Sequence, residues 1–317
     1  MTVSLVAGAA GFLGSHLARR LLMAGHHVIG VDNFSTSSNK NLEDILNDKN
    51  FRFVQASVSD NLQDLDLGNL SFVFHLASPA SPPKYQKLGI ETLRANTVGT
   101  ENLISLAISN SARFIFASTS EVYGDPQVSP QPEEYWGNVN PIGPRSVYDE
   151  SKRLGETLVA HYIREESLNG GIVRIFNTYG PGMDPFDGRV VSTFIRQALA
   201  SEPFSIFGDG KQTRSFCYVD DLISGIILMA ESQLSGPINL GNPAEIDLMR
   251  LGKEVASVVG TEPKFEFHDL PEDDPKQRKP DISKASSLLG WQPTTTLAEG
   301  LSKTASWMTL LDLGRSN

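Results

Sequence analysis

The stretch Gly8-Ala9-Ala10-Gly11-Phe12-Leu13-Gly14 follows the apolar segment 3–7 and precedes a helical pattern from residue 15 to about residue 23. The next apolar segment ends in an acid, Asp32. Glycines between a strand and a helix let the backbone approach a pyrophosphate, and the helix N-terminus offers unpaired N–H groups. We therefore predict a dinucleotide-binding turn, although glycines at this spacing also occur in a tight turn with no ligand.

Asp32 is the residue from which we predict the cofactor. A carboxylate at the end of the second strand accepts hydrogen bonds from the adenosine ribose hydroxyls and repels a 2′-phosphate. This favours NAD over NADP. The alternative is an acid that only caps the local backbone.

Strand and helix patterns alternate along the first part of the chain, which predicts an α/β fold of the Rossmann type with a doubly wound parallel sheet. Strands are expected at 3–7, 28–32, 51–56, 72–77, 113–117 and 171–176, and helices at 90–110 and from 148 to about 167. Shorter, mixed elements follow Asn177. We expect residues 1–177 to form the cofactor domain, with 212–243 returning to it, and residues 178–211 and 244–317 to form a smaller mixed α/β lobe that binds substrate.

Composition narrows the classes of function. The 317 residues carry a net charge of -10, so neither nucleic acid nor another polyanion is an expected partner. The single cysteine and the scattered histidines predict no metal site. No apolar run approaches the roughly 20 residues of a membrane span. Because a strand follows Met1 almost at once, we expect no signal peptide and a cytoplasmic protein.

A second constellation carries the predicted chemistry. Ser118-Thr119-Ser120-Glu121 follows an apolar strand, at the sheet edge where ligands bind in such folds. Tyr148 and Lys152 are four residues apart, so they share one face of a helix. An ammonium group beside a phenol favours the phenolate, and we therefore expect Lys152 to lower the pKa of Tyr148 and make it a base.

Longer motifs carry a resemblance that covers nearly the whole chain. They are HLASPASPP (75–83), STSEVYGDP (118–126), YWGNVNPIGPRSVYDESK (135–152), NTYGP (177–181), DGRVVSTF (187–194) and DDPKQRKPDI (273–282). With them the chain resembles the extended short-chain dehydrogenases/reductases that act on nucleotide sugars, and among these the UDP-glucuronic acid decarboxylases. The resemblance implies oxidation of UDP-glucuronate at carbon 4, loss of carbon dioxide from the 4-keto intermediate, and reduction to UDP-xylose with NAD regenerated in each cycle.

The resemblance also assigns residues. Those implied in catalysis are Thr119, Ser120, Glu121, Tyr148, Lys152 and Arg278. Those implied in NAD binding are Gly8, Gly11, Phe12, Leu13, Gly14, Asp32, Asn33, Leu76, Ala77, Ser78, Tyr148 and Lys152. Those implied in binding the UDP-sugar are Arg94, Tyr162, Asn177, Thr178, Arg189, Phe207, Arg214 and Arg278. We expect burial and the substrate carboxylate to raise the pKa of Glu121, which suits an acid–base role.

Alternatives stay open at this point. Sugar 4,6-dehydratases have an aspartate where this chain has Ser120, which argues against dehydration. A nucleotide-sugar 4-epimerase would need the same Tyr148, Lys152 and NAD. A non-catalytic NAD-binding scaffold is the alternative of another class. The resemblance further implies a homodimer, formed through the helices expected at 90–110 and 148–167.

Overall fold

The computed structural model describes residues 1–62, 65, 67–165, 168–269 and 277–311. Its centre is a seven-stranded sheet of order β11-β6-β5-β4-β1-β2-β3, and every strand pair in it is parallel. This confirms the predicted Rossmann-type fold. The strands are β1 (Val3–Ala7), β2 (His27–Asp32), β3 (Phe51–Gln55), β4 (Phe72–His75), β5 (Arg113–Thr119), β6 (Gly170–Ile175) and β11 (Ile238–Leu240).

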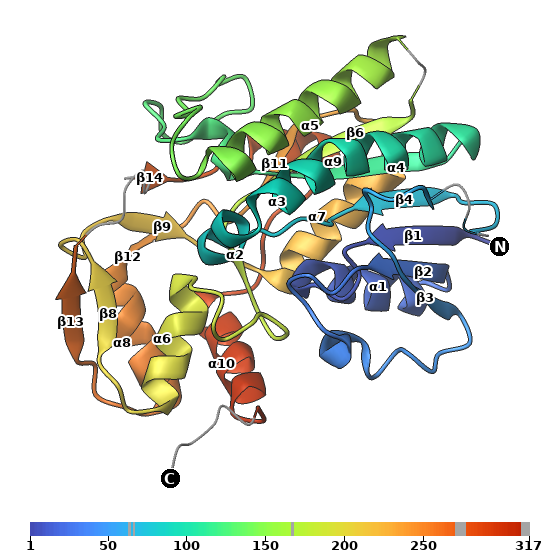
Figure 1. Ribbon diagram of the computed structural model, residues 1–317. Coiled ribbons are helices and arrows are strands. Elements are labelled where there is room, and N and C mark those ends of the chain that lie inside the picture. Colours follow the sequence, from blue (N-terminus) through green and yellow to red (C-terminus); the bar gives the residue numbers. More distant parts are fainter. Residues whose placement is uncertain (63–64, 66, 166–167, 270–276, 312–317) are drawn as a thin grey trace.

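Helices cover both faces of this sheet (Figure 1). The elements between the strands are α1 (Phe12–Met23), the 3-10 turns η1 (Asn39–Leu42) and η3 (Ser120–Tyr123), α2 (Pro82–Lys87), α3 (Gly89–Asn96), α4 (Val98–Ser109), α5 (Ser146–Glu165) and α7 (Val219–Glu231). Consecutive strand residues point to opposite faces. Leu5 therefore joins the core beneath α4 and α5, whereas Val6 joins the core that α1 and α7 close.

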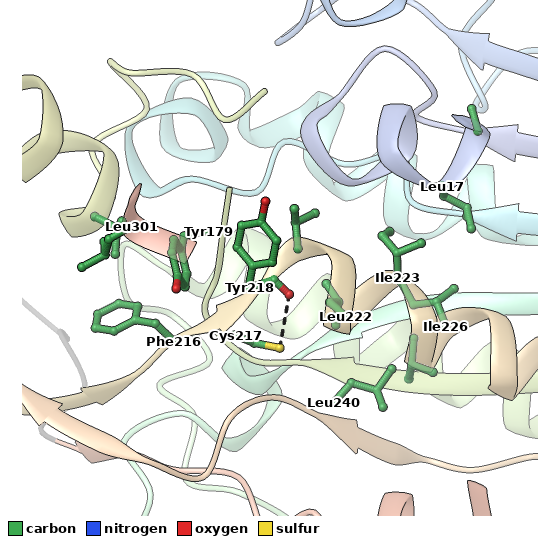
Figure 2. Packing of buried hydrophobic residues seen from close by; sticks show 14 of the residues in the cluster. Leu17, Tyr179, Phe216, Cys217, Tyr218, Leu222, Ile223, Ile226, Leu240 and Leu301 are labelled. Carbon is green, nitrogen blue, oxygen red and sulfur yellow. Dashed lines mark hydrogen bonds between the residues drawn. The ribbon is translucent and has the colours of Figure 1, made fainter. Parts of the chain in front are cut away.

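The core on the α7 face links the sheet to the rest of the molecule. Leu222, Ile223 and Ile226 of α7 pack in one cluster with Leu17 of α1 and Leu240 of β11 (Figure 2). All five side chains are at most 3% exposed. Helix α7 thus covers the parallel sheet and β11 belongs to it, although both come after part of the C-terminal lobe in the chain.

The C-terminal lobe contains two small sheets, β12-β9-β14 and β13-β8, with helices beside them. A two-stranded sheet, β10-β7, lies at the junction of this lobe with the core. Its elements are β7 (Thr178–Tyr179), α6 (Val190–Leu199), β8 (Phe204–Phe207), β9 (Thr213–Ser215), β10 (Cys217–Tyr218), β12 (Glu245–Asp247), α8 (Leu248–Val259), β13 (Phe265–His268), β14 (Gln277–Arg278), α9 (Ser283–Leu289) and α10 (Leu297–Met308). Helix α8 ends at Gly260, in the left-handed conformation that favours glycine.

One predicted helix is wrong. Residues 90–110 form two helices, α3 and α4, that meet at Thr97. Side chains compete for the carbonyls near this point: the Thr97 hydroxyl donates to Leu93 O at 2.7 Å, and the ring of His75 bonds Ala95 O at 3.2 Å.

Helix α2 was not predicted at all. It begins at Pro82, in the first turn of a helix, where the N–H group that proline lacks would have no partner within the helix.

Two predicted features fall partly outside the described residues, namely the end of the helix near residue 167 and residues 273–276 of the motif 273–282. Within the part that the structure describes, no helix has the length and apolar character needed to cross a membrane. The same residues contain no group of three or more side chains able to hold a metal ion.

Candidate active site

A cavity of about 940 Å³ lies where the glycine turn, the ends of β4, β5 and β6, and helix α5 meet. Many predicted site residues line it. They are Gly11, Phe12, Leu13, Gly14, Leu76, Ser78, Thr119, Ser120, Glu121, Tyr148, Lys152, Asn177, Thr178 and Arg189. The cavity is therefore the candidate active site.

The glycine turn has the shape that a dinucleotide phosphate requires. Gly8 has φ +83°, and a Cβ there would lie 2.8 Å from Ala77 N. At Gly14 a Cβ would lie 2.0 Å from Gly8 O. Helix α1 begins after Gly11 with no side chain capping it, so its first N–H groups are available at the cavity wall.

Asp32 ends β2 beside this turn. Its carboxylate accepts hydrogen bonds from Ala10 N at 3.0 Å, Phe34 N at 2.8 Å and the Ser37 hydroxyl at 3.0 Å. These bonds hold the turn and the following loop together. Asn33 and Ala77 adjoin the cavity-lining segments, and the contacts of Asp32 and Asn33 with an adenosine ribose stay predictions.

Tyr148 and Lys152 come from the first turns of α5 and are 6% and 2% exposed. Lys152 Nζ donates to Ala117 O at 2.7 Å and lies 4.9 Å from the centre of the Phe116 ring. Tyr148 stacks on Tyr85 of α2, with ring centres 5.0 Å apart and an angle of 3° between the planes. The two side chains are thus held in place by the strand below and the helix beside them.

The expected lowering of the Tyr148 pKa is wrong for this arrangement. Burial raises the pKa of Tyr148 to about 12, and Glu121 adds to the rise, while Arg189 and a hydrogen bond with Thr119 lower it. Burial also lowers the pKa of Lys152 to about 7. The ammonium group is 5.9 Å from the Tyr148 ring centre, and the charge that most opposes the rise is that of Arg189.

The expectation for Glu121 is also wrong. Arg278 donates to both of its carboxylate oxygens, at 2.5 and 2.7 Å, and Arg145 donates to one at 2.7 Å. Burial alone would raise the pKa of Glu121, but the two guanidinium groups lower it to about 2. Glu121 is therefore an ionised partner of two arginines, and the arginines stand behind it, 9% and 6% exposed.

The predicted sugar-binding residues divide into two sets. Arg189 lines the cavity, where it pairs with Asp187 at 3.4 Å and donates to Ala80 O at 3.0 Å. The residues that lie away from the cavity wall are Arg94, exposed on α3; Tyr162, which bonds Glu101 at 3.4 Å; Phe207, 46% exposed beside His268; and Arg214, which donates to Thr213 O at 2.9 Å. The structure does not bring this second set to the cavity wall, and Arg278 does not line the cavity either, because it stands behind Glu121.

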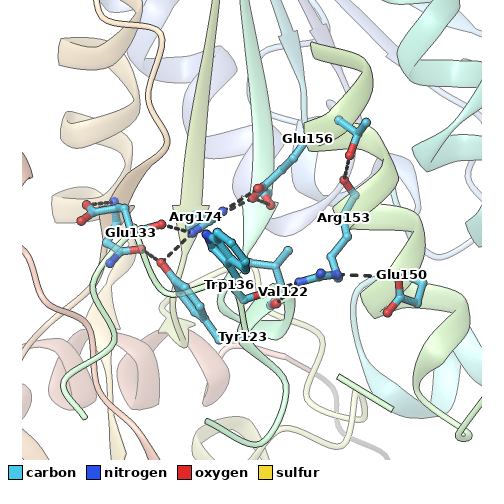
Figure 3. Close-up of polar contacts among 11 residues, drawn as sticks. Val122, Tyr123, Glu133, Trp136, Glu150, Arg153, Glu156 and Arg174 are labelled. Atoms are coloured by element: carbon cyan, nitrogen blue, oxygen red, sulfur yellow. Dashed lines mark hydrogen bonds and ion pairs between the residues drawn. The ribbon is translucent and has the colours of Figure 1, made fainter. Parts of the chain in front are cut away.

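A polar network behind the site was missed by sequence reasoning (Figure 3). Arg174 of β6 donates to both oxygens of Glu156, at 2.9 and 2.7 Å, and to the Tyr123 hydroxyl at 2.9 Å. The Ser118 hydroxyl donates to the same Glu156 at 2.5 Å. Glu156 opposes the lowering of the Lys152 pKa. Because Glu156 lies four residues after Lys152, helical spacing was the signal in the sequence that could have identified it.

Arg145, Asp149 and Tyr85 were missed as well. Arg145 lies three residues before Tyr148 and Asp149 directly follows it, and both side chains are buried. Spacing was again the available signal, because Arg145 precedes Tyr148 by three residues and Asp149 by four. Tyr85 gave no such signal, since it meets Tyr148 only in the folded chain.

The sequence is similar to those of known proteins along most of its length. Residues 4–241 match the sequence model of the NAD dependent epimerase/dehydratase family. UDP-glucuronic acid decarboxylase 1 of Xenopus tropicalis is 48% identical over 300 residues, which are 95% of this chain and 70% of that protein.

Solved structures of the same kind superpose closely. UDP-glucose 4-epimerase of Thermotoga maritima has a TM-score of 0.90 at 30% identity, covering 98% of this chain and 99% of the other. UDP-glucuronic acid 4-epimerase of Bacillus cereus, in complex with UDP-glucuronic acid and NAD, has a TM-score of 0.85 at 30% identity, with the same coverage.

Proposed function

The chain belongs to the NAD dependent epimerase/dehydratase family, and from this membership we propose that it converts UDP-glucuronate to UDP-xylose and carbon dioxide. The observation that carries the proposal is the 48% identity, over 95% of this chain, to a protein named UDP-glucuronic acid decarboxylase. The glycine turn, Tyr148, Lys152 and the arginine-paired Glu121 supply a site suited to that reaction.

NAD fits the residues present, because the Gly8 and Gly14 backbones leave room at the N-terminus of α1 that a Cβ would fill. The residues that would hold it are the glycine turn, Asp32, Leu76, Ser78 and Lys152. When bound, NAD would supply the oxidation of carbon 4 and the later reduction, by taking up and returning a hydride.

The protein's own groups move the protons. Tyr148 is the base in our proposal: it accepts the proton of the carbon 4 hydroxyl and returns it when the ketone is reduced. The Thr119 hydroxyl orients the carbon 4 oxygen, since it already bonds Tyr148. The carbon 4 ketone lies β to the carboxylate, so the bond to carbon dioxide breaks with its electrons taken up as an enolate. Carbon 5 of the enolate then takes up one proton, which comes from solvent, and this restores the ketone that is reduced. Glu121 lines the cavity and is held as an anion by Arg145 and Arg278, which stand behind it.

Product analysis tests the proposal. The purified protein is incubated with NAD and UDP-glucuronate, and carbon dioxide and the sugar product are followed by gas detection and NMR. We expect stoichiometric carbon dioxide and UDP-xylose. Absence of turnover in NAD-loaded protein would refute the proposal.

A second candidate is a UDP-glucuronate 4-epimerase, which the similarity to the Bacillus cereus enzyme favours. Such an enzyme retains the carboxylate and inverts carbon 4. In the same NMR experiment UDP-galacturonate, with no carbon dioxide, would select this candidate over decarboxylation.

We also propose a cytoplasmic homodimer. Helices α3, α4 and α5 leave apolar side chains in solvent: Ile90 is 61%, Val98 44% and Leu154 47% exposed. A two-fold contact would bury them. Light scattering should give twice the chain mass, and Leu154→Glu should give the monomer. A wild-type monomer at micromolar concentration would contradict the homodimer. Cell fractionation tests whether the protein is cytoplasmic.

A further inference from the structure

Lys84 of α2 bridges two sides of the cavity, and the proposed reaction gives it no role. Its ammonium group donates to Thr36 O at 3.1 Å and to Asp184 Oδ2 at 2.7 Å. All three residues line the cavity, as do Gly11 and Gly14 of the glycine turn. One side chain therefore joins three segments that are far apart in the chain, at the wall of the space that would hold the cofactor.

The order of the strands places this bridge in front of the glycine turn. Thr36 lies in the loop after β2, and Lys84 lies in the helix that follows β4. Strand β1, which leads into the glycine turn, lies between β2 and β4 in the sheet. Both loops leave the carboxyl edge of a parallel sheet, so a bond between them passes across the end of β1. This is where the pyrophosphate of a dinucleotide binds in such folds.

Residues 181–189, which we call the strap, lie along the same cavity and are tied to the cofactor domain. His16 of α1 bonds Pro181 O at 2.7 Å. Asn41 of η1 donates to Gly182 O at 3.1 Å. The bond from Lys84 to Asp184 adds an ionic contact to these neutral ones. The strap is thus fastened over the cofactor side of the cavity, and Lys84 fastens it to the loop after β2 as well.

Asp184 is oriented and ionised for this contact. Phe186 N donates to its Oδ1 at 2.9 Å, and Lys84 donates to its Oδ2. Burial would raise the pKa of Asp184, but the hydrogen bonds from Lys84 and Phe186 N lower it below its ordinary value. The side chains of Lys84 and Asp184 are 29% and 42% exposed. Water reaches the ion pair, so it can break and form again without unfolding of the strap.

We propose that Lys84 is a latch that retains NAD: the cofactor enters and leaves only while the bonds from Lys84 to Thr36 O and Asp184 are broken. The role rests on the use of NAD in the proposed function. An enzyme that regenerates its cofactor in each cycle needs to keep it bound, because loss of the nucleotide between oxidation and reduction would leave the sugar as a ketone. Lys84 acts on exchange of the cofactor and is not a catalytic residue.

The test measures exchange of NADH, whose fluorescence reports binding, in the wild type and in Lys84→Met, which keeps the apolar stem. Mixing nucleotide-free protein with NADH gives the association rate constant, and displacing bound NADH with excess NAD gives the dissociation rate constant. We expect both to rise about 3–10-fold in the variant, the effect of losing one partly exposed ion pair and one hydrogen bond. The dissociation constant should not change, because an open latch speeds entry and exit equally.

Lys284→Met is the matched control. Lys284 also forms an ion pair, with Glu134, and is 38% exposed, but it does not line the cavity. Both of its rate constants should equal those of the wild type. Wild-type rate constants in Lys84→Met itself would overturn the proposal.

Asp184→Asn separates a latch from a direct ligand of the pyrophosphate, and it keeps the proposal testable if Lys84→Met does not fold. A latch predicts faster association and faster dissociation in this variant too. If Lys84 instead bound the pyrophosphate, Asp184→Asn would free its ammonium group and tighten NADH binding, and Lys84→Met would slow association. Either result would reject the latch. Because no sugar is present, these outcomes are independent of whether the protein decarboxylates UDP-glucuronate.

Discussion

Tyr148 and Glu121 show how far the surroundings of a side chain alter its chemistry. The pKa of Tyr148 lies near 12 because burial dominates, and that of Glu121 near 2 because two arginines outweigh burial. Burial raises the pKa of both residues, but Glu121 has two guanidinium groups within hydrogen-bond distance, whereas Tyr148 has the Thr119 hydroxyl and the negative charge of Glu121 nearby. Reactivity in this site is therefore decided by partners that are distant in sequence.

Replacing Tyr148 with phenylalanine should remove the proposed base. We expect kcat for carbon dioxide release to fall about 10²–10⁴-fold, the usual contribution of general acid–base catalysis. KM should change little, because the ring and its stacking on Tyr85 remain. Steady-state kinetics measures both values, and circular dichroism controls for folding. Unchanged kcat would show that another group accepts the proton.

Replacing Arg278 with methionine should destabilise the protein, because Glu121 loses one of its two buried cations. We expect the free energy of unfolding at pH 7 to fall by about 3 kcal/mol in urea titration. Arg250→Met, which removes an exposed ion pair with Glu254 at 3.8 Å, is the matched control and should cost less than about 1 kcal/mol.

The loss of stability in Arg278→Met should depend on pH. The folded-state pKa of Glu121, about 2, is below its ordinary value of 4.5, so this carboxylate stabilises the fold above pH 4.5 and the effect is lost as the pH falls toward 2. The difference between wild type and Arg278→Met should shrink over that window. A difference independent of pH would contradict the ion pair as its cause.

Helix α5 is the element that carries the reactive pair. Its close approach to the sheet depends on Gly155, where a Cβ would lie 2.4 Å from Phe116 Cζ of β5. Phe116 also lies beneath Lys152. The spacing between helix and strand therefore sets the height of Tyr148 and Lys152 above the sheet edge.

Gly155→Ala should push α5 away from β5. We expect the free energy of unfolding to fall by about 1–3 kcal/mol through overpacking, and kcat to fall while UDP binding persists. Gly89→Ala in α3 is the control, since its Cβ would make only an ordinary contact of 3.5 Å with Val147. Equal effects of the two substitutions on kcat would refute a role for the spacing.

Across the whole molecule, a short segment joins the C-terminal lobe to the active site. Gln131 N donates to Lys279 O at 2.8 Å, and Lys279 N donates to Gln131 Oε1 at 2.8 Å. Asp281 N donates to Gln131 O at 3.0 Å. Gln131 is fully buried. It thus anchors the segment that delivers Arg278 to Glu121.

Gln131→Ala should loosen that anchor. We expect faster hydrogen exchange at the amide of Lys279, a loss of about 1–3 kcal/mol in the free energy of unfolding, and a lower kcat through Arg278. Gln292→Ala, at an exposed residue bonded to Ser286, is the control. Exchange at Lys279 that matches the wild type would rule out the anchoring role.

The sequence by itself determined the parts of this protein that depend on neighbours along the chain. The glycine turn, the alternation of strands with helices and the four-residue spacing of Tyr148 and Lys152 are local patterns, and each appears in the structure where it was expected. The break at Thr97 was missed, and one of the bonds beside it joins Ala95 O to the His75 ring, 20 residues away in the chain.

Only the tertiary structure decided the electrostatics of the site. Arg278 reaches Glu121 across 157 residues, and Tyr85 reaches Tyr148 from a different helix. Desolvation and ion pairing depend on which groups surround a side chain in space, and periodicity along a chain holds no information about them. The pKa directions of Tyr148 and Glu121 were therefore wrong from sequence, although the residues themselves lie in the candidate site.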